Sequence, residues 1–413
     1  MDFPICFAAW TKDDNLRFES TSGGLFSEFA LSVLKYGGYV CGARYNDNND
    51  VEHCIIQRDK DLREIRQSKY VQSSMNDVYS NVKKILEDNN RVLFCGTPCQ
   101  VAGLKSYLNE DYASLFTIDF ICKGVNSPKA YRSWINEIEK NEKKNAVNVW
   151  FKYKEGGWKT SPLRTKITFE DGTFKIFDQS KNLFMRGYLE QNLYTRESCG
   201  LCRFKGIPRQ GDITLADFWG VDRKYDTDQG TSMVMINNAR GMQLWNRISE
   251  RIICYQADTD NIINGNPMLT ESTAINPKAN EFLTSLTDDN FSVSIRKCLK
   301  KKDGIIQKIK RHLGTSGHYD RIKCDPVIRN PEYNHNIDQG KKYKKKVPHL
   351  YSYKDDCMGC TACYAACPVN AIAMLEDEEG FVYPSIDAKE CIRCNKCINV
   401  CPIKREDEYA CAN

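Results

Sequence analysis

Two runs near the C-terminus repeat one cysteine pattern: Cys357-Met-Gly-Cys360-Thr-Ala-Cys363-Tyr-Ala-Ala-Cys367-Pro368 and Cys391-Ile-Arg-Cys394-Asn-Lys-Cys397-Ile-Asn-Val-Cys401-Pro402. Each run reads C-x2-C-x2-C-x3-C-P, and the second copy follows the first at an offset of 34 residues. The two-residue spacers let three thiolates surround one metal centre, and the proline then turns the chain away. This segment is therefore predicted to fold around metal.

The duplicated run is typical of bacterial ferredoxins, in which the fourth cysteine of each copy ligates the other 4Fe–4S cluster. One cluster then takes Cys357, Cys360, Cys363 and Cys401, and the other takes Cys367, Cys391, Cys394 and Cys397. The alternative is a pair of four-cysteine zinc sites, whose knuckles also use C-x2-C. Zinc does not require a duplicated run ending in proline, so the spacing favours iron–sulfur clusters. Residues 380–387 predict the connecting hairpin of such a unit.

The composition agrees with metal or redox chemistry inside a cell. The chain has 413 residues, 20 cysteines and only five histidines, none near a cysteine pair at zinc-finger spacing. Residues 1–14 have no basic residue before Lys12 and too short an apolar stretch for a signal peptide, so the thiols are expected to stay reduced. The net charge of +5 does not favour nucleic acid, and no apolar run approaches the ~20 residues of a membrane span. We expect a soluble, cytoplasmic protein.

The preceding part of the chain alternates strand and helix patterns. Apolar residues at helical spacing predict helices over 25–34 and 78–86, with Asn76 as a cap of the second. Short buried strands are predicted at 39–43, 91–95, 115–120 and 212–217. This rhythm predicts an α/β fold with a mainly parallel sheet covered on both faces.

An antiparallel insert interrupts this rhythm and gives the body a mixed α+β character. Residues 147–153, 164–169 and 173–177 alternate apolar and polar side chains, and Asp171-Gly172 separates the last two. An Asp-Gly pair between alternating segments is a β-hairpin signature.

Four body cysteines lie where strands end or loops turn: Cys99, Cys122, Cys199 and Cys202. Ligands of open α/β sheets collect at the carboxyl ends of strands, so the four can form a third all-cysteine site. Two alternatives stay open. The four can be ordinary buried thiols, or Cys99 can be a redox nucleophile partnered by Cys95, because a helix N-terminus stabilises a thiolate.

The body resembles the coenzyme F-420 hydrogenase/dehydrogenase beta-subunit family. The matching segments are Ser20-Thr-Ser-Gly-Gly-Leu-Phe26, Ser68-Lys-Tyr-Val-Gln72, Gly96-Thr-Pro-Cys-Gln-Val-Ala-Gly-Leu104, Ile121-Cys-Lys-Gly124, Ser198-Cys-Gly-Leu-Cys-Arg-Phe-Lys-Gly206 and Asp212-Ile-Thr-Leu-Ala-Asp-Phe-Trp-Gly220. The resemblance implies a flavin, usually FAD, beside a 4Fe–4S cluster whose ligands map onto Cys99, Cys122, Cys199 and Cys202. It also implies flavin contacts from Gly23, Gly24, Lys69, Tyr70 and Thr97.

Local chemistry supports part of that flavin assignment. The paired glycines precede a predicted helix, and Thr97 with Pro98 suits the N-cap and first position of another. Such helix starts offer backbone N–H groups to a phosphate or a flavin oxygen. A plain tight turn is the alternative interpretation of Gly23 and Gly24.

Two features depart from the family's pattern. Bacterial members usually carry the ferredoxin unit at the N-terminus, whereas here it is C-terminal. Lys123 stands where many relatives have histidine, so Lys123 is the candidate catalytic residue if that histidine donates a proton.

The sequence divides into a flavin and 4Fe–4S body at 1–314, a polar basic linker at 315–350 and a two-cluster ferredoxin domain at 351–405. The linker has ample reach for the tail to dock on the body. A basic run at 296–311 can hold the acidic tail to the body, or it can bind an outside acidic ferredoxin. The alternative is a solvated helix face and a soluble tail.

The sequence thus predicts an iron–sulfur flavoprotein oxidoreductase. Electrons from ferredoxin or another low-potential donor would enter the tail clusters and pass through the body cluster to FAD and an unidentified small-molecule substrate. The alternative is an electron-transfer subunit without its own substrate, serving a partner enzyme. Only the family's name suggests a deazaflavin, and the glycines form no dinucleotide fingerprint that would indicate NAD. His53 is expected on an outward strand face, and Trp158 and Trp219 are expected as core or lid residues.

Overall fold

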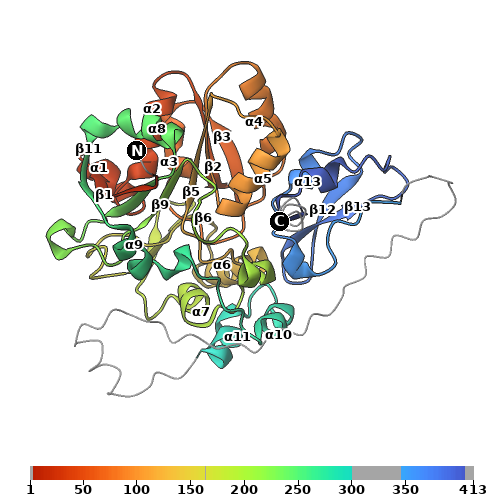
Figure 1. The fold of residues 1–413 in the computed structure, drawn as a ribbon. Coiled ribbons are helices and arrows are strands. Elements are labelled where there is room, and N and C mark those ends of the chain that lie inside the picture. Colours follow the sequence, from red (N-terminus) through yellow and green to blue (C-terminus); the bar gives the residue numbers. More distant parts are fainter. Residues whose placement is uncertain (1–2, 163, 300–345, 405–413) are drawn as a thin grey trace.

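The computed structural model describes residues 3–162, 164–299 and 346–404 (Figure 1). An eight-stranded sheet forms the centre of the body, in the order β11-β1-β10-β9-β5-β4-β2-β3. Its strands are β1 (Ile5–Thr11), β2 (Tyr39–Tyr45), β3 (Val51–Ile56), β4 (Val92–Cys95), β5 (Leu115–Phe120), β9 (Ile213–Asp217), β10 (Ser232–Ile236) and β11 (Ile252–Gln256). The central strands β2, β4, β5 and β9 are parallel, and the strands on either side pair antiparallel. The predicted α/β class is confirmed.

Helices cover both faces of this sheet. On one face lie α2 (Leu25–Leu34) and α8 (Ala239–Asn246), and on the other lie α4 (Val78–Glu87) and α5 (Pro98–Leu108). Successive side chains of a strand point to opposite faces, so Leu93 of β4 joins the first core and Phe94 joins the second. The shorter helix α3 (Leu62–Ile65) joins the core of α2 and α8, whereas α9 (Thr259–Gly265) packs on the opposite face, against β1 and β10. Helix α1 (Asp14–Glu19) follows β1 in the chain.

The N-cap of α4 differs from the prediction, because Asp77 rather than Asn76 precedes the helix. The Asn76 backbone is left-handed, with φ of 42°, and its side chain accepts a hydrogen bond from the Ser74 hydroxyl.

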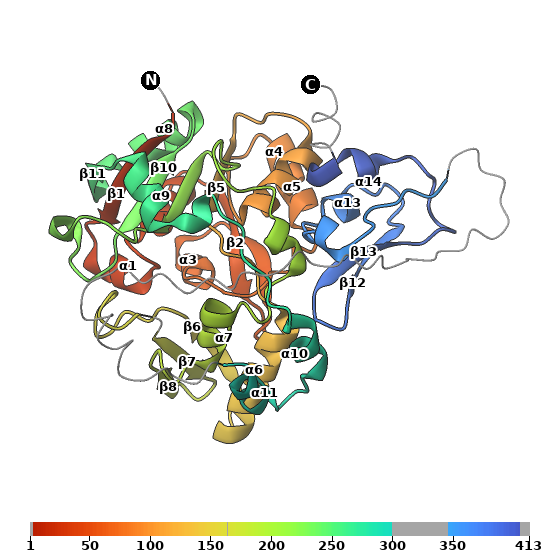
Figure 2. The same cartoon turned by 60° about the horizontal axis from the view of Figure 1, so that its bottom comes forward.

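The predicted antiparallel insert is present as a separate three-stranded sheet, in the lower part of Figure 2. It contains β6 (Ala146–Trp150), β7 (Thr165–Phe169) and β8 (Phe174–Phe177). Its core is shared with α6 (Pro128–Glu142), α7 (Leu183–Gln191), α10 (Ala279–Ser285) and α11 (Phe291–Cys298). Trp134 and Phe184 stack at the centre of this core, with ring centroids 5.0 Å apart.

The tail folds as a small unit with an internal repeat. It contains α13 (Ala362–Ala365), β12 (Ile372–Glu376), β13 (Val382–Ile386) and α14 (Lys396–Asn399), and the two strands form the predicted hairpin. Figures 1 and 2 both show the tail, in blue, beside α5 and α4 of the body. The predicted linker at 315–350 lies mostly outside the described residues. In the part of the chain that is described, no helix is long and apolar enough to cross a membrane.

Candidate functional site

The four body cysteines come from three separate segments and line one cavity. Cys99 lies in the first turn of α5, Cys122 follows β5, and Cys199 and Cys202 lie in and directly after the 3-10 helix η2 (Glu197–Leu201). Burial raises the pKa of Cys99 well above its ordinary value, and the neighbouring thiols Cys122, Cys202 and Cys199 also raise it. This grouping favours a shared ligand set over a pair made by Cys99 and Cys95.

The lining of this cavity suits an iron–sulfur cluster. Four thiols form the donor set, and the Ser198 hydroxyl beside them is buried without a hydrogen-bond partner among the described residues. Gly124 allows the approach of Cys199, because a Cβ at Gly124 would lie 3.2 Å from the Cys199 Cβ and 2.6 Å from Thr195. The φ of Gly124, 143°, is also one that side chains other than glycine rarely adopt. Residues that a third cluster needs are therefore present and close together.

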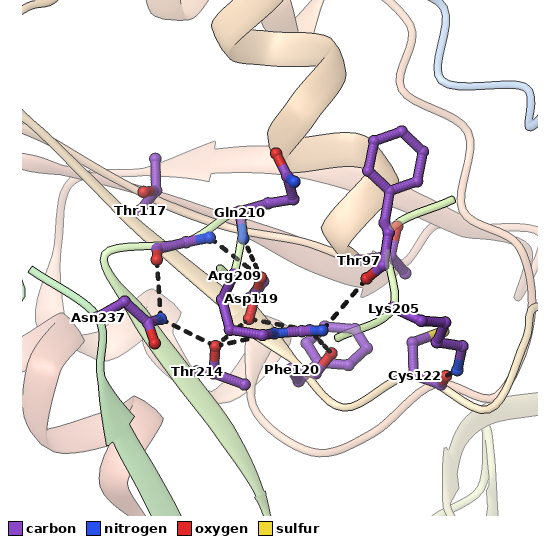
Figure 3. Close-up of polar contacts among 12 residues, drawn as sticks. Thr97, Thr117, Asp119, Phe120, Cys122, Lys205, Arg209, Gln210, Thr214 and Asn237 are labelled. Atoms are coloured by element: carbon purple, nitrogen blue, oxygen red, sulfur yellow. Dashed lines mark hydrogen bonds and ion pairs between the residues drawn. The ribbon is translucent and has the colours of Figure 1, made fainter. Parts of the chain in front are cut away.

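A buried ion pair between Arg209 and Asp119 holds two of the ligand loops in place (Figure 3). The Arg209 guanidinium donates to the backbone carbonyls of Phe120 and Phe204, at 3.3 and 3.2 Å. Asp119 of β5 accepts hydrogen bonds from the backbone N–H groups of Gln210 and Gly211, at 3.1 and 3.0 Å. The loop after Cys202 is thereby fixed to the end of the strand that leads to Cys122.

Two lysines add positive charge at the cavity wall. Lys205 donates to the backbone carbonyl of Cys122 at 2.6 Å. Lys123 donates to the Tyr188 carbonyl at 3.1 Å and to the Asn192 side chain. Burial, with a smaller effect of Lys205, lowers the pKa of Lys123 to about 7. Lys123 also lines the four-cysteine cavity, where negative charge on a cluster would favour its protonated form.

The five residues assigned to flavin contacts fall into separate places. Thr97 lines the four-cysteine cavity and closes a capping box with Gln100 at the start of α5, as predicted for its N-cap. The N–H of Gly23 donates to the Ser232 hydroxyl at 2.9 Å, and Gly24 caps α2 with φ of 83°. The Tyr70 ring packs between Phe151 and Tyr188, with centroids 5.5 and 5.7 Å away. The Ser68 hydroxyl lies 3.2 Å from the Thr21 hydroxyl, so the backbone of the next residue, Lys69, is near the glycine turn.

Three cations in this region form no ion pair with a carboxylate among the described residues, and two of them, Arg17 and Lys154, lie against the turn. Lys69 donates to the Glu64 and Arg66 carbonyls at 3.0 and 2.5 Å, and Lys154 donates to the carbonyls of Arg17 and Ser22. Burial lowers the pKa of each lysine to about 7. Arg17, which is 3% exposed, donates to uncharged groups of residues 227–230 and, in the described part of the chain, to no others. The sequence did not point to Arg17 or Lys154, because neither belongs to a recognisable motif.

A second, smaller cavity lies beside the end of β9. Trp158 and Trp219 line it and stack in parallel, with centroids 4.9 Å apart and an interplanar angle of 5°. Lys152 also lines it and pairs with Asp217. The Trp158 indole nitrogen and one Asp217 carboxylate oxygen are buried without a hydrogen-bond partner among the described residues.

His53 is buried, which contradicts the expected surface position. The side chain is 5% exposed, and its ring contacts the Ser73 hydroxyl at 2.8 Å and the Cys95 carbonyl at 3.1 Å. The physical reason is that residues 71–76 run along β3 and cover it, as the backbone bonds of Ser74 show. Burial lowers the pKa of His53 to about 4.

The tail cysteines lie in two groups. Burial raises the pKa of Cys360, and Cys401 and Cys357 act on it in the same direction. Burial likewise raises the pKa of Cys397, and Cys391 and Cys394 add to that effect. Cys401 of the second run therefore lies with the first ligands of the first run. Among the described residues, no three His, Cys, Asp or Glu side chains are close enough to hold a single metal ion. The cysteine ligands of a four-iron cluster lie further apart than the ligands of a single ion, because four irons separate them.

The first tail run docks against the wall of the four-cysteine cavity. Met358 and Gly359 line that cavity together with Cys99. Cys360 packs on α5, where a Cβ at Gly103 would lie 3.2 Å from its Sγ.

Further contacts come from α6. Of the predicted basic surface at 296–311, residues 300–311 lie outside the described residues. Arg132 pairs with Glu376 at 2.5 Å, and Lys129 donates to the Glu378 carbonyl at 2.9 Å.

Comparisons with known proteins follow the same division of the chain. Residues 89–261 match the family model for the C-terminal part of the coenzyme F420 hydrogenase/dehydrogenase beta subunit, and residues 356–404 match the "4Fe-4S dicluster domain". No curated protein matches the chain. Among solved structures, it is similar to a chain of the xenon-derivatized F420-reducing NiFe hydrogenase complex from Methanosarcina barkeri, at 16% identity over 65% of this chain and 86% of that chain, with a TM-score of 0.45. The match to the coenzyme F420 hydrogenase/dehydrogenase beta-subunit model therefore covers all four body cysteines, and the match to the 4Fe–4S dicluster model covers all eight tail cysteines.

Proposed function

We propose that the chain is an iron–sulfur flavoprotein oxidoreductase in which a third 4Fe–4S cluster and FAD in the body are served by the dicluster tail. The supporting observation is one cavity that contains all four body cysteines and is lined on the tail side by Met358 and Gly359. The ligand set of the third cluster is Cys99, Cys122, Cys199 and Cys202. When bound, such clusters transfer single electrons, and a flavin couples them to two-electron chemistry.

The cations around residues 17–24 support a flavin dinucleotide. A buried cation without a negative partner is costly, and a diphosphate would supply the missing counter-charge. Lys69 and Lys154 would neutralise that diphosphate, and Arg17 would hold the turn against residues 227–230. Thr97 would stand between this flavin region and the four cysteines.

The cavity beside Trp158 and Trp219 supports a substrate position near the end of β9. The Trp158 indole N–H, which has no hydrogen-bond partner among the described residues, would orient a small molecule with a complementary acceptor. Lys152 would hold Asp217 in place through their ion pair.

The experiment is the anaerobic purification and reconstitution of the full chain, with iron, acid-labile sulfide and released flavin measured per polypeptide. About twelve irons, from three clusters of four, and about one flavin support the proposal. Cys99→Ser should lose about four of those irons, whereas Cys95→Ser, the matched control on the preceding strand, should keep them. About eight irons without flavin would contradict it.

Turnover separates the enzyme from the carrier alternative. The reduced chain should reduce a small-molecule acceptor on its own. Reoxidation of the flavin only in the presence of a partner protein would favour an electron-transfer subunit.

A further inference from the structure

At one position, which faces the body in the first run, the two tail runs carry different residues. Arg393 of the second run corresponds to Gly359 of the first, and both have a left-handed backbone, with φ of 59° and 67°. The Arg393 guanidinium donates to the backbone carbonyl of Cys391, the first ligand of its own run, at 3.2 Å. Gly359 has no side chain with which to do this for Cys357.

The body supplies the missing guanidinium. Arg196, which directly precedes η2, donates through Nε and Nη2 to the Cys357 carbonyl, at 3.1 and 3.0 Å. It also donates to the Val382 carbonyl at 3.1 Å and to Gln72 at 2.9 Å. The same type of contact, from a guanidinium to the carbonyl of a first ligand, therefore occurs in both runs, but from different domains.

Gly359 is the residue that makes room for this contact. A Cβ at Gly359 would lie 3.1 Å from the Arg196 Nη1 and 2.7 Å from the Gln72 Nε2. An arginine in the first run, as in the second, would occupy the space that Arg196 enters.

Among the described residues, no carboxylate forms an ion pair with Arg196, and Asp377 acts on it only electrostatically. The Arg196 side chain is fully buried, its hydrogen-bond acceptors are uncharged, and its guanidinium lies 4.1 Å from the centroid of the Tyr383 ring. A buried cation in this situation needs a counter-charge. Cys357 and Cys199 both act electrostatically on Arg196, so it lies between a tail ligand and a body ligand.

We propose that Arg196 is a positioning residue that completes the tail cluster of Cys357, Cys360, Cys363 and Cys401 from the body, in the role that Arg393 has for the other tail cluster. One-electron reduction adds one negative charge to a 4Fe–4S centre, so a nearby buried guanidinium stabilises the reduced state and raises the reduction potential. Docking of the tail therefore sets the potential of the cluster nearest to the body. This deepens the proposed function, and it rests on the tail clusters alone.

The test compares Arg196→Gln, Arg196→Lys and the matched control Arg393→Gln in the full, reconstituted chain. The midpoint potentials of the tail clusters are measured by electrochemical reduction monitored by EPR. Arg196→Gln should lower the potential of one tail cluster, Arg393→Gln should lower that of the other, and the double variant should lower both. Arg196→Lys, which keeps the charge but not the paired hydrogen bonds, should give a smaller shift of the same cluster.

The proposal is overturned if Arg196→Gln keeps its iron and shifts neither potential, or if both glutamine variants shift the same cluster. If Arg196→Gln loses iron, Arg196→Lys decides: a shift confined to one cluster supports the proposal, and no shift contradicts it. Gln72→Ala leaves the contact with Cys357 in place and should leave both potentials unchanged. A chain with about eight irons and no flavin that still shows the cluster-specific shifts would overturn the proposed function and keep this inference.

Discussion

Arg209 and Asp119 form an ion pair at 3.3 Å in which the side chains are only 1% and 0% exposed. Asp119 belongs to β5, whose chain continues to Cys122, and Arg209 belongs to the loop that follows Cys202. The pair therefore couples two segments that carry cluster-ligand candidates and that lie far apart in the sequence. Figure 3 shows the hydrogen bonds that complete it on both sides.

Removing one partner of this pair should destabilise the protein. Arg209→Leu leaves a buried carboxylate without its cation, which typically costs roughly 3–5 kcal/mol. We expect a lower midpoint in chemical unfolding and a selective loss of body iron. The control is Arg240→Gln, because Arg240 pairs with the exposed Asp111 and such surface pairs contribute under about 1 kcal/mol. Equal losses in the two variants would contradict this account.

The sign of the stability change caused by Gly103→Ala tests whether the tail docks on α5. In a helix interior, Gly→Ala alone stabilises by roughly 0.5–1 kcal/mol. Here the added methyl group would lie 3.1 Å from the Cys360 Cβ and 2.9 Å from the Tyr79 hydroxyl. Gly103→Ala should therefore destabilise the chain and speed proteolysis of the tail, and Gly103→Val should do so more strongly. Stabilisation by Gly103→Ala would show that Cys360 does not pack on α5.

His53 should make stability depend on pH between about 4 and 6.5. Its pKa is lowered to about 4 in the folded chain, so the unfolded state binds the proton first as the pH falls. Stability is then greatest above about pH 6.5 and decreases toward pH 4, by roughly 2 kcal/mol between pH 7.5 and 5. His53→Gln should flatten this slope in urea unfolding at pH 5 to 7.5. The control is His349→Gln, because His349 lies at an exposed position near the start of the tail.

Flavin affinity should fall as the pH rises through about 7. Lys69 and Lys154 both have a pKa lowered to about 7 by burial, so each carries its positive charge below that pH and loses it above. An anionic diphosphate is therefore held best on the acidic side. Lys154→Met should weaken FAD binding at pH 6.5 and flatten the profile, measured by fluorescence quenching on titration of the apo-chain. Lys140→Met, at an exposed site, should leave the profile unchanged. A profile that rises with pH would contradict the assignment.

Short-range features could be predicted from the sequence because neighbouring residues determine them. The spacing of the tail cysteines limits which thiols can reach one centre, and Thr97 followed by Pro98 and Gln100 starts a helix through its own hydrogen bonds. The strand of residues 115–120 was predicted with its observed bounds, since a short apolar run between turns is a local pattern.

Other elements depend on partners that are distant in the chain. No local pattern identified β1, which pairs antiparallel with β10 and β11 more than two hundred residues later. His53 alternates like an exposed strand residue, and only the segment at 71–76 buries it. A single-sequence pattern contains no information about which segment covers a strand.

The sequence by itself determined the donor atoms: eight tail thiols at fixed spacings and four body thiols at strand ends or turns. Only the tertiary structure decided that Cys99, Cys122, Cys199 and Cys202 share one cavity, and that Arg196 reaches across to Cys357 beside Gly359. The physical reason is distance along the chain. Ligands separated by two or three residues are held together by backbone geometry, whereas ligands on separate loops meet only after the sheet has paired and the tail has docked.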